Sequence, residues 1–368
     1  MDALRPGGSA ERATELHALL LLDQAEGIGP RRILRLVEQF GSAARALGAP
    51  ARTFEAVAGV PRATVDLPEH RARVAEALRQ AQRLGIAVLG WRDEAYPERL
   101  RALHDPPPVL FLRGRPELLG RLAVAVVGAR RATARGRDLA RRLGERLARG
   151  GAVVVSGLAL GVDGAAHQGA LDGGGPTIAV VGRGADLPYP PSHGRLFRRI
   201  LEQGLVVSEF LPGTPPLPHH FPRRNRIMAA LADTLVVVEA GARSGALITV
   251  EHALDLGREV WSVPGPIDTP SCAGSNGLLA EGARPLVSIE RFVAETGLSG
   301  PPAAEDAPGP SSESELRLLE GLRAGPAHVD ELASRAGLAI PIALALLVEL
   351  ELRGAVEQMP GLFFRGAA

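Results

Sequence analysis

The chain has 368 residues, a formal net charge of +1, 46% hydrophobic residues and 23% charged residues. This length suggests two or three domains, and the composition excludes a wholly disordered or fibrous chain. The single cysteine, Cys272, cannot form an internal disulfide, which favours a reducing compartment. The longest early apolar run, within residues 16–22, is too short to span a bilayer and no cleavage site follows it. We therefore expect a soluble cytoplasmic protein without membrane insertion.

The basic side chains are all arginine, because the sequence contains no lysine. A phosphate-binding loop ending in Gly-Lys-Ser/Thr and a Schiff-base lysine are therefore excluded, and any phosphate must be held by arginine side chains and backbone amides. Residues 121–150 carry nine arginines against two acids, and residues 219–230 carry three arginines and no acid. Residues 315–368 carry five arginines against seven acids, so the centre of the chain is basic and its tail is acidic.

Residues 1–84 are expected to form a small helical domain. Apolar residues recur at helical spacing on both sides of a glycine turn at residues 27–30, Gly-Ile-Gly-Pro. The pattern resembles a SAM-like or helix-hairpin-helix domain, in which turn amides and the next helix N-terminus can hold a nucleic-acid phosphate. An ordinary helical hairpin that needs glycine to turn explains the same pattern, so both interpretations stay open.

Residues 85–296 alternate between strand-like and helix-like segments. The expected strands are short apolar or β-branched runs at residues 86–89, 109–112, 122–127, 152–155, 177–181, 205–207, 235–238 and 259–263. The helix-length segments between them include residues 135–149, 192–202 and 246–256. Continuous apolar strands with helical crossovers form a parallel sheet covered on both faces, so the predicted fold class is α/β with a Rossmann-like core.

The C-terminal part predicts a linker and a third domain. Residues 297–314 lack periodicity and are rich in Pro, Gly and Ser, which is typical of a linker. Residues 315–368 predict three helices and a hairpin, an order that resembles a winged helix. The third helix, residues 341–352, carries apolar and acidic side chains, which repel phosphate and offer few groups for reading bases. We therefore expect this domain to contact protein or to be structural.

The first candidate site lies where the first central strand leads into a helix, at residues 127–133. This is the edge at which an open parallel sheet binds ligands. Gly128 lets the backbone amides around Ala129 approach a phosphate, and Arg130 can add a bidentate contact. The Gly-x-Gly-x-x-Gly spacing is absent, and Ser156-Gly157 rather than an acid follows the next strand, which argues against dinucleotide binding. A glycine turn with a solvated arginine is the alternative.

Asp163 and His167 lie four residues apart, so on a helix they share one face and suggest a metal or an acid/base pair. No third metal ligand occurs at useful spacing, and Asp163 is as well placed to cap the helix with His167 packed behind it. We therefore predict a structural pair, and we predict no metal, cofactor or catalytic residue in the chain.

The most informative stretch is residues 219–230, His-His-Phe-Pro-Arg-Arg-Asn-Arg-Ile-Met-Ala-Ala. Arg224 and Arg226 flank Asn225 at a helix start, with Phe221 and two histidines before them. Arginine forks beside stacking surfaces are what single-strand binders use, and stacking contributes about 1 to 3 kcal/mol per base with little sequence preference. The alternative is that Phe221 belongs to the core and the arginines pair with acids of neighbouring helices.

A second strand-to-helix turn carries Ser244 and Gly245, after the expected strand at residues 235–238. Amides at this turn would form another phosphate site, and it would face the same edge of the sheet as Gly128. A plain strand-to-helix turn explains the same residues.

Five ordered motifs within residues 86–290 are Val-Gly-Ala-Arg-Arg-Ala-Thr, Ser-Gly-Leu-Ala-Leu-Gly-Val-Asp, Phe-Pro-Arg-Arg-Asn-Arg-Ile, Val-Glu-Ala-Gly-Ala-Arg-Ser-Gly-Ala-Leu-Ile-Thr and Val-Pro-Gly-Pro. In these motifs the chain resembles the DNA-processing protein A family (DprA, also called Smf). The resemblance implies a homodimeric, non-enzymatic protein of natural transformation. Such a protein binds and protects incoming single-stranded DNA and helps to load a RecA-type recombinase onto it.

Carried over by motif, the resemblance implies that Arg130 and the amides around Gly128 hold phosphate. Phe221, Arg224 and Arg226 would lie along the DNA strand, with Ser244 and Gly245 as the second amide site. Family members often place lysines in this groove, so here those contacts are either absent or made by arginine.

An enzyme is the alternative. Rossmann-like hydrolases that release a base from a nucleoside monophosphate use a similar turn with a threonine followed by an acid, which Thr249 and Glu251 loosely imitate. The double-glycine signature of those hydrolases is absent, since residues 239–241 are Glu-Ala-Gly. Incubating the protein with nucleoside monophosphates and measuring free base distinguishes the hydrolase hypothesis from the DNA-binding one.

Overall fold

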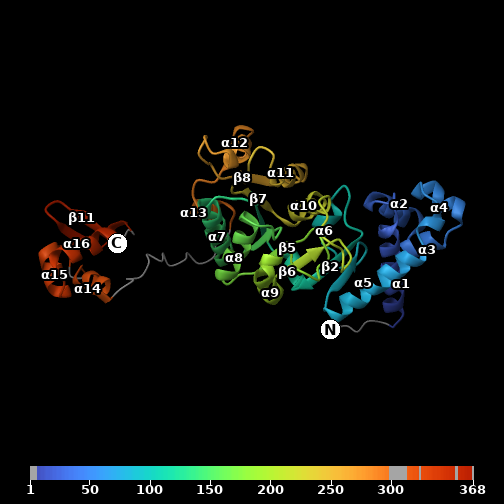
Figure 1. The fold of residues 1–368 in the computed structure, drawn as a ribbon, viewed down its shortest axis with the longest axis horizontal. Helices are drawn as coiled ribbons and strands as arrows, with labels where there is room; N and C mark the ends of the chain where they lie inside the picture. The colour runs from blue at the N-terminus through green and yellow to red at the C-terminus, as the bar shows by residue number, and fades with distance from the viewer. Residues whose placement is uncertain (1–5, 298–312, 323–324, 353–354, 367–368) are drawn as a thin grey trace. The chain divides into compact units, whose positions relative to one another are not determined.

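The computed structural model describes residues 6–297, 313–322, 325–352 and 355–366. Contacts divide the chain into two compact units, residues 1–300 and residues 301–368 (Figure 1). Residues 298–312 of the expected linker lie outside the described residues, and the first helix of the second unit, α14, begins at Glu313.

Five α-helices precede the sheet. They are α1 (Pro6–Gln24), α2 (Pro30–Phe40), α3 (Ala43–Gly48), α4 (Ala51–Ala58) and α5 (Pro68–Arg83), with a short 3-10 helix, η1, at Arg62–Thr64. Gly27 makes the turn after α1 with a φ of +79°, which glycine adopts at little cost. Leu22 and Ile33 are fully buried in a hydrophobic core that also contains Phe111 and Val206 of the sheet. The N-terminal helices, called here the helical segment, therefore pack on the sheet edge.

The sheet has nine strands in the order β1-β2-β6-β5-β4-β3-β7-β8-β9. Their bounds are β1 Ala87–Gly90, β2 Val109–Gly114, β3 Ala123–Val127, β4 Val153–Ser156, β5 Thr177–Val180, β6 Leu205–Ser208, β7 Thr234–Val237, β8 Glu259–Ser262 and β9 Arg284–Pro285. Strands β3 to β9 are parallel to one another, which confirms the predicted parallel core. At one edge β1 pairs antiparallel with β2, and β2 pairs antiparallel with β6.

Helices cover both faces of the sheet, as Figure 1 shows. They are α6 (Glu98–Arg101), α7 (Ala134–Arg149), α8 (Val162–Asp172), α9 (Gly194–Gln203), α10 (His220–Leu231), α11 (Ala246–Asp255), α12 (Ala273–Ala280) and α13 (Ile289–Glu295). Ala125 and Val127 of β3 share a core with α10 and α11, whereas Val124 and Val126 share another with α7, α8 and α13. This alternation follows from the two-residue period of a strand, and it makes a fully buried central strand.

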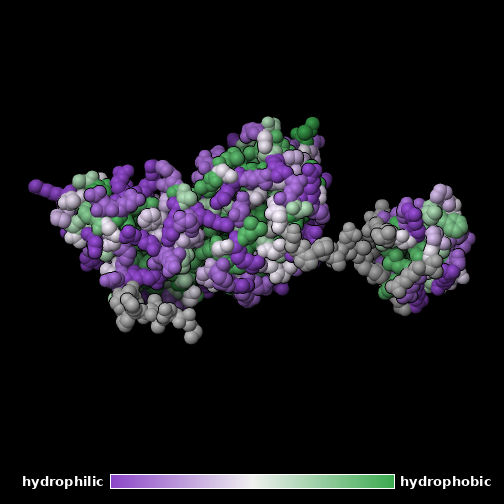
Figure 2. Space-filling view, turned by 180° about the vertical axis from the view of Figure 1, so that it is seen from behind, coloured by the Kyte–Doolittle hydropathy of each residue, from purple (hydrophilic) through white to green (hydrophobic). Residues whose placement is uncertain are grey.

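The C-terminal unit has the order of a winged helix, as the sequence predicted. It contains α14 (Glu313–Leu322), β10 (Ala327–His328), α15 (Val329–Ala336), α16 (Ile340–Leu352), β11 (Val356–Met359) and β12 (Phe363–Gly366). On α16 the side chains of Ile342 and Val348 are 54% and 40% exposed. Figure 2 shows hydrophobic patches among the hydrophilic side chains of this unit. The outer face of α16 is therefore apolar where a DNA reader would carry hydrogen-bond donors.

Within the described residues, no single helix is both long and apolar enough to cross a membrane. The segments Val329–Ala336 and Ile340–Glu351 meet the criteria of length and composition only as a pair, and they are bent by 105° relative to each other.

A fully buried histidine links α8 to the sheet. His167 Nε2 accepts a hydrogen bond from the Leu158 amide at 3.3 Å, so Nδ1 carries the proton and lies 2.7 Å from Thr177 Oγ1. That hydroxyl in turn donates to the Val154 carbonyl at 2.6 Å. Burial lowers the pKa of His167 to about 3, so the imidazole is neutral in the folded protein.

Asp163 does not cap α8 as expected. Gly161 occupies the N-cap position, and Asp163 instead accepts a hydrogen bond from the Ala159 amide at 3.4 Å and lies 3.8 Å from Arg224. Among the described residues, no group of three or more His, Cys, Asp or Glu side chains is arranged to hold a metal ion.

We expect the stability advantage of the wild-type protein over a His167→Asn variant to narrow by about 2 kcal/mol between pH 7 and pH 5. The histidine of the unfolded chain takes up a proton near pH 6.5, whereas the buried one stays neutral down to about pH 3. The stability due to neutral burial is thus complete above pH 6.5 and is lost as the pH falls. Urea unfolding at both pH values measures the free energy of unfolding of each protein. If that free energy changes with pH equally in the two proteins, His167 is not buried in its neutral form.

Candidate nucleic-acid interface

The candidate site lies where the strand order reverses. The chain runs outward from β3 to β4 on one side and from β7 to β8 on the other, so β3 and β7 are neighbours at a topological switch point. The turns that follow these two strands meet at the carboxyl edge of the sheet, where the Ala129 amide donates to the Glu239 carbonyl at 2.6 Å. Open α/β sheets bind their ligands in this crevice.

A cavity of about 700 Å³ opens at this point. Its volume is within the range of typical small-molecule sites. The structure brings eight of the ten predicted site residues to its lining, namely Gly128, Ala129, Arg130, Phe221, Arg224, Asn225, Ser244 and Gly245. Gly157 and Arg226 are not part of the lining.

The rim of the cavity combines aromatic rings with arginines. The Arg130 guanidinium lies 4.9 Å from the centroid of the Phe221 ring, in cation–π geometry. Tyr189, whose ring centroid is 5.7 Å from that of Phe221, extends the aromatic surface and is 37% exposed. Arg131 and Arg243 also line the cavity. Across the described ranges none of these three arginines forms an ion pair, so their charges are available to a bound anion.

Sequence reasoning missed Tyr189, Arg131 and Arg243. Tyr189 lies in the proline-rich segment that follows β5, so the carboxyl edge of a parallel strand was the signal that could have found it. Arg131 and Arg243 lie directly beside residues that were predicted, within the same two turns.

Several backbone groups near Gly128 are engaged within the protein. The Glu239 carboxylate accepts the Thr133 amide at 3.2 Å and the Thr133 hydroxyl at 2.8 Å, so it occupies the N-terminus of α7 where an external anion was expected. A Cβ at position 128 would lie 2.6 Å from the Val162 side chain and 2.8 Å from the Glu239 carbonyl oxygen. The glycine is therefore required by internal packing.

Arg224 forms the floor of the cavity rather than its rim. The side chain is 4% exposed, and Nη1 donates to the Gly157 carbonyl at 2.6 Å and to the Val180 carbonyl. Its Nε donates to Asn225 Oδ1 at 3.0 Å. Burial lowers the pKa of Arg224 to about 10, and the nearby Asp163 carboxylate opposes that shift, so the side chain stays charged at neutral pH. Any Cβ at position 157 would overlap the guanidinium, which explains the glycine there.

Asn225 connects the floor to the second turn. Its Nδ2 donates to the Gly245 carbonyl at 3.2 Å. Gly245 is the N-cap residue of α11, and the Ser244 hydroxyl accepts the Ala246 amide at 3.3 Å. The floor and both turns are thus held in one hydrogen-bonded arrangement.

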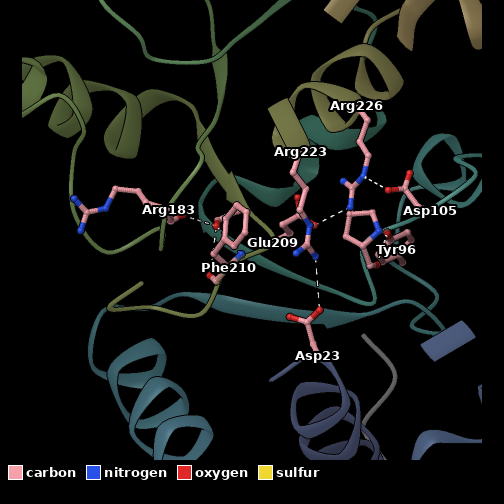
Figure 3. Close-up of polar contacts among 10 residues, drawn as sticks. Asp23, Tyr96, Asp105, Arg183, Glu209, Phe210, Arg223 and Arg226 are labelled. Carbon is pink, nitrogen blue, oxygen red and sulfur yellow. Dashed lines mark hydrogen bonds and ion pairs between the residues drawn. The ribbon is translucent and has the colours of Figure 1, made fainter. Parts of the chain in front are cut away.

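Arg226 lies in an ion-pair network, shown in Figure 3, whose central pair, Arg226 and Glu209, is buried. It is 2% exposed, and its Nε and Nη2 atoms donate to Asp105 at 2.9 Å and to Glu209 at 2.7 Å. Glu209 also accepts Arg223 Nε at 2.9 Å, and Arg223 reaches Asp23 of α1 at 3.7 Å. Arg226 therefore makes the internal pairing that the sequence left open as an alternative.

Two family models match the chain. The model described as DNA recombination-mediator protein A matches residues 87–297, and the DprA winged helix domain model matches residues 301–361. Protein Smf of Escherichia coli is 40% identical over 282 residues, which cover 74% of this chain and 75% of that protein. DNA processing protein DprA of Streptococcus pneumoniae is 43% identical over 203 residues, which cover 55% of this chain and 72% of that protein.

Solved structures of similar proteins match as well. The X-ray structure of DNA processing protein A from Streptococcus pneumoniae has a TM-score of 0.67 and 34% identity, and the match covers 77% of this chain and 97% of that one. A structure of DNA processing protein A from Helicobacter pylori has a TM-score of 0.53 and 31% identity, and the match covers 57% of this chain and 95% of that one. That structure concerns the single-stranded DNA binding mode of the Helicobacter protein.

We expect Arg224→Ala to lower the free energy of unfolding by about 3 to 5 kcal/mol, because it leaves the Asp163 carboxylate buried and the Gly157 and Val180 carbonyls without their donor. Arg130→Ala should change it by less than about 0.5 kcal/mol, because that side chain is exposed. Urea unfolding of the two variants tests this division between floor and rim. Equal destabilisation by both substitutions would show that the division is wrong.

Proposed function

Because this chain belongs to the DNA recombination-mediator protein A family, we propose that it binds single-stranded DNA at the switch-point cavity and acts in natural transformation and recombination. The observation that carries the proposal is the rim, where Phe221 and Tyr189 lie beside three arginines that form no ion pair with any residue the structure describes. Unpaired bases stack on aromatic rings and phosphates bind guanidinium groups, so this combination suits a single strand with little base preference.

The ten predicted site residues take two roles in this proposal. Arg130, Phe221, Ser244 and Gly245 contact the DNA, together with Tyr189, Arg131 and Arg243. Arg224, Asn225 and Gly157 support the cavity floor, because their polar groups are directed to one another and to neighbouring carbonyls. Gly128 and Ala129 form the turn that carries Arg130. Arg226 connects α10 to the core through its ion pair with Glu209.

We assign no catalytic role to the site. Thr249 lines the cavity, but Glu251, the acid that would complete a hydrolase pair, is exposed and is not part of the lining. Residues two apart on a helix point in nearly opposite directions, so α11 cannot direct both side chains at one sugar. The carboxylate that does line the cavity, Asp163, is buried against Arg224. Absence of free base after incubation with nucleoside monophosphates is the expected result.

The wider role that we propose includes a homodimer, protection of the incoming strand in the cytoplasm and delivery to a RecA-type recombinase. The recombinase partner is supported by the description of the matching family as recombination mediators. The single cysteine agrees with a reducing compartment.

The wild-type protein should bind oligothymidylate with an affinity that falls with salt, with a log–log slope of about −0.7 per phosphate contact. Arg130→Ala should weaken binding to all sequences alike and flatten the slope by about one contact. Arg198→Ala is the matched control, since Arg198 is an exposed α9 residue with no ion pair within the described part of the chain. Fluorescence anisotropy at two salt concentrations measures these constants. If Arg130→Ala and Arg198→Ala bind like the wild type, the rim is not the DNA site.

We expect the wild-type protein to shorten the lag before a RecA-type recombinase forms filaments on single-stranded DNA, because it would present the strand to the recombinase. Arg130→Ala should lose this effect and Arg198→Ala should keep it. The lag is measured with fluorescently labelled DNA. An unchanged lag, in a preparation that binds DNA normally, would refute the loading role and leave the binding role intact.

A further inference from the structure

A second cavity, of about 630 Å³, lies between the helical segment and the core. It is called here the junction cavity. Asp23 and Gln24 at the end of α1 and Arg73 of α5 line one side. The loop between β6 and α10, with His220 of α10, lines the other.

One short segment of chain separates the junction cavity from the switch-point cavity. Pro216, Pro218 and Phe221 line the switch-point cavity, whereas Leu217 and His220 line the junction cavity. Neighbouring residues of the segment 215–221 therefore face alternately toward the two cavities. The two cavities therefore lie on either side of this segment.

The junction cavity contains a buried polar group without a partner. His220 is 7% exposed, and its Nδ1 atom has no hydrogen-bond partner among the described residues. Its ring is held by stacking on Phe210, with the centroids 4.0 Å apart. A buried nitrogen without a hydrogen-bond partner is unfavourable, and the residue that carries it lines the cavity.

We propose that the junction cavity binds a second nucleobase of the same DNA strand, so that the binding path continues from the core onto the helical segment. This inference rests on the proposed function. The edge of a nucleobase carries both donors and acceptors, which matches the amide of Gln24 and the imidazole of His220. Leu217 and Pro215 provide apolar surfaces against which the ring of a base can lie.

The charges around the junction cavity fit a strand that runs past its mouth. Arg73 is exposed, and the hydrogen bond that it makes, at 3.4 Å, goes to Gln24 rather than to a carboxylate. It is therefore placed to meet the phosphate of the bound nucleotide. Two acids line the cavity, and both are paired within the protein. Asp23 lies 3.7 Å from Arg223, and Glu76 forms ion pairs with Arg79 and Arg83.

The test is a comparison of oligothymidylates of about 4 and about 16 nucleotides, which span the known site sizes of single-strand binders. Gln24→Glu is isosteric and places a negative charge in the junction cavity. Gln39→Glu makes the same change at an exposed position on α2 and is the matched control. Arg73→Gln is an independent variant at an exposed residue, with Arg52→Gln on α4 as its control.

We expect Gln24→Glu and Arg73→Gln to weaken binding of the long oligonucleotide several-fold and to leave the short one unchanged, while both controls bind like the wild type. Equal binding of the long oligonucleotide by all four variants would overturn the inference, and so would equal weakening at both lengths. Failure of the wild-type protein to bind either length would instead refute the proposed function itself.

Discussion

The buried guanidinium of Arg224 is the interaction on which the site depends. It joins the loop after β4, the end of β5 and the start of α10 by donating to Gly157, Val180 and Asn225. Each of these groups belongs to a different crossover unit, so without a common donor the carboxyl edge would present three independent loops. A charged donor in a buried site forms strong hydrogen bonds, and its position therefore determines where Phe221 and Gly245 lie.

Arginine suits this floor better than lysine would, for a structural reason. A buried lysine readily loses its proton, whereas arginine stays charged even where burial lowers its pKa to about 10. The planar group also serves several carbonyls at once, which an ammonium group on a flexible stem does less well. Arginine can therefore supply both the fixed floor and the free rim, and burial alone decides which role each residue takes.

Much of the fold was predictable, because the spacing of apolar residues that distinguishes strands from helices can be recognised within a short stretch of sequence. The strands of the parallel core, the two turns at its carboxyl edge and the winged helix all follow from such patterns. The antiparallel edge was not foreseen, since the alternation of apolar runs does not encode strand direction. Of the site, the sequence indicated the edge and most of the lining residues, because the ends of parallel strands meet there.

The roles of the individual arginines were not predictable from the sequence. Arg224 and Arg226 belong to one motif, but the groups that engage them are as many as 67 and 121 residues away in the chain. Whether a guanidinium faces solvent or a buried carboxylate is therefore decided by tertiary packing. Tyr189 has the same origin, because only the folded loop after β5 brings it next to Phe221.

Helix α10 connects the site to the helical segment. Phe221 faces the switch-point cavity, and two residues later Arg223 pairs with Glu209 of the core and Asp23 of α1. Burial raises the pKa of Asp23 to about 6, against the opposing effect of Arg223. One helix therefore carries both Phe221 of the aromatic rim and, two residues later, the arginine that contacts α1. The helical segment is thus tied to the element that presents the rim, although it supplies none of the rim's side chains.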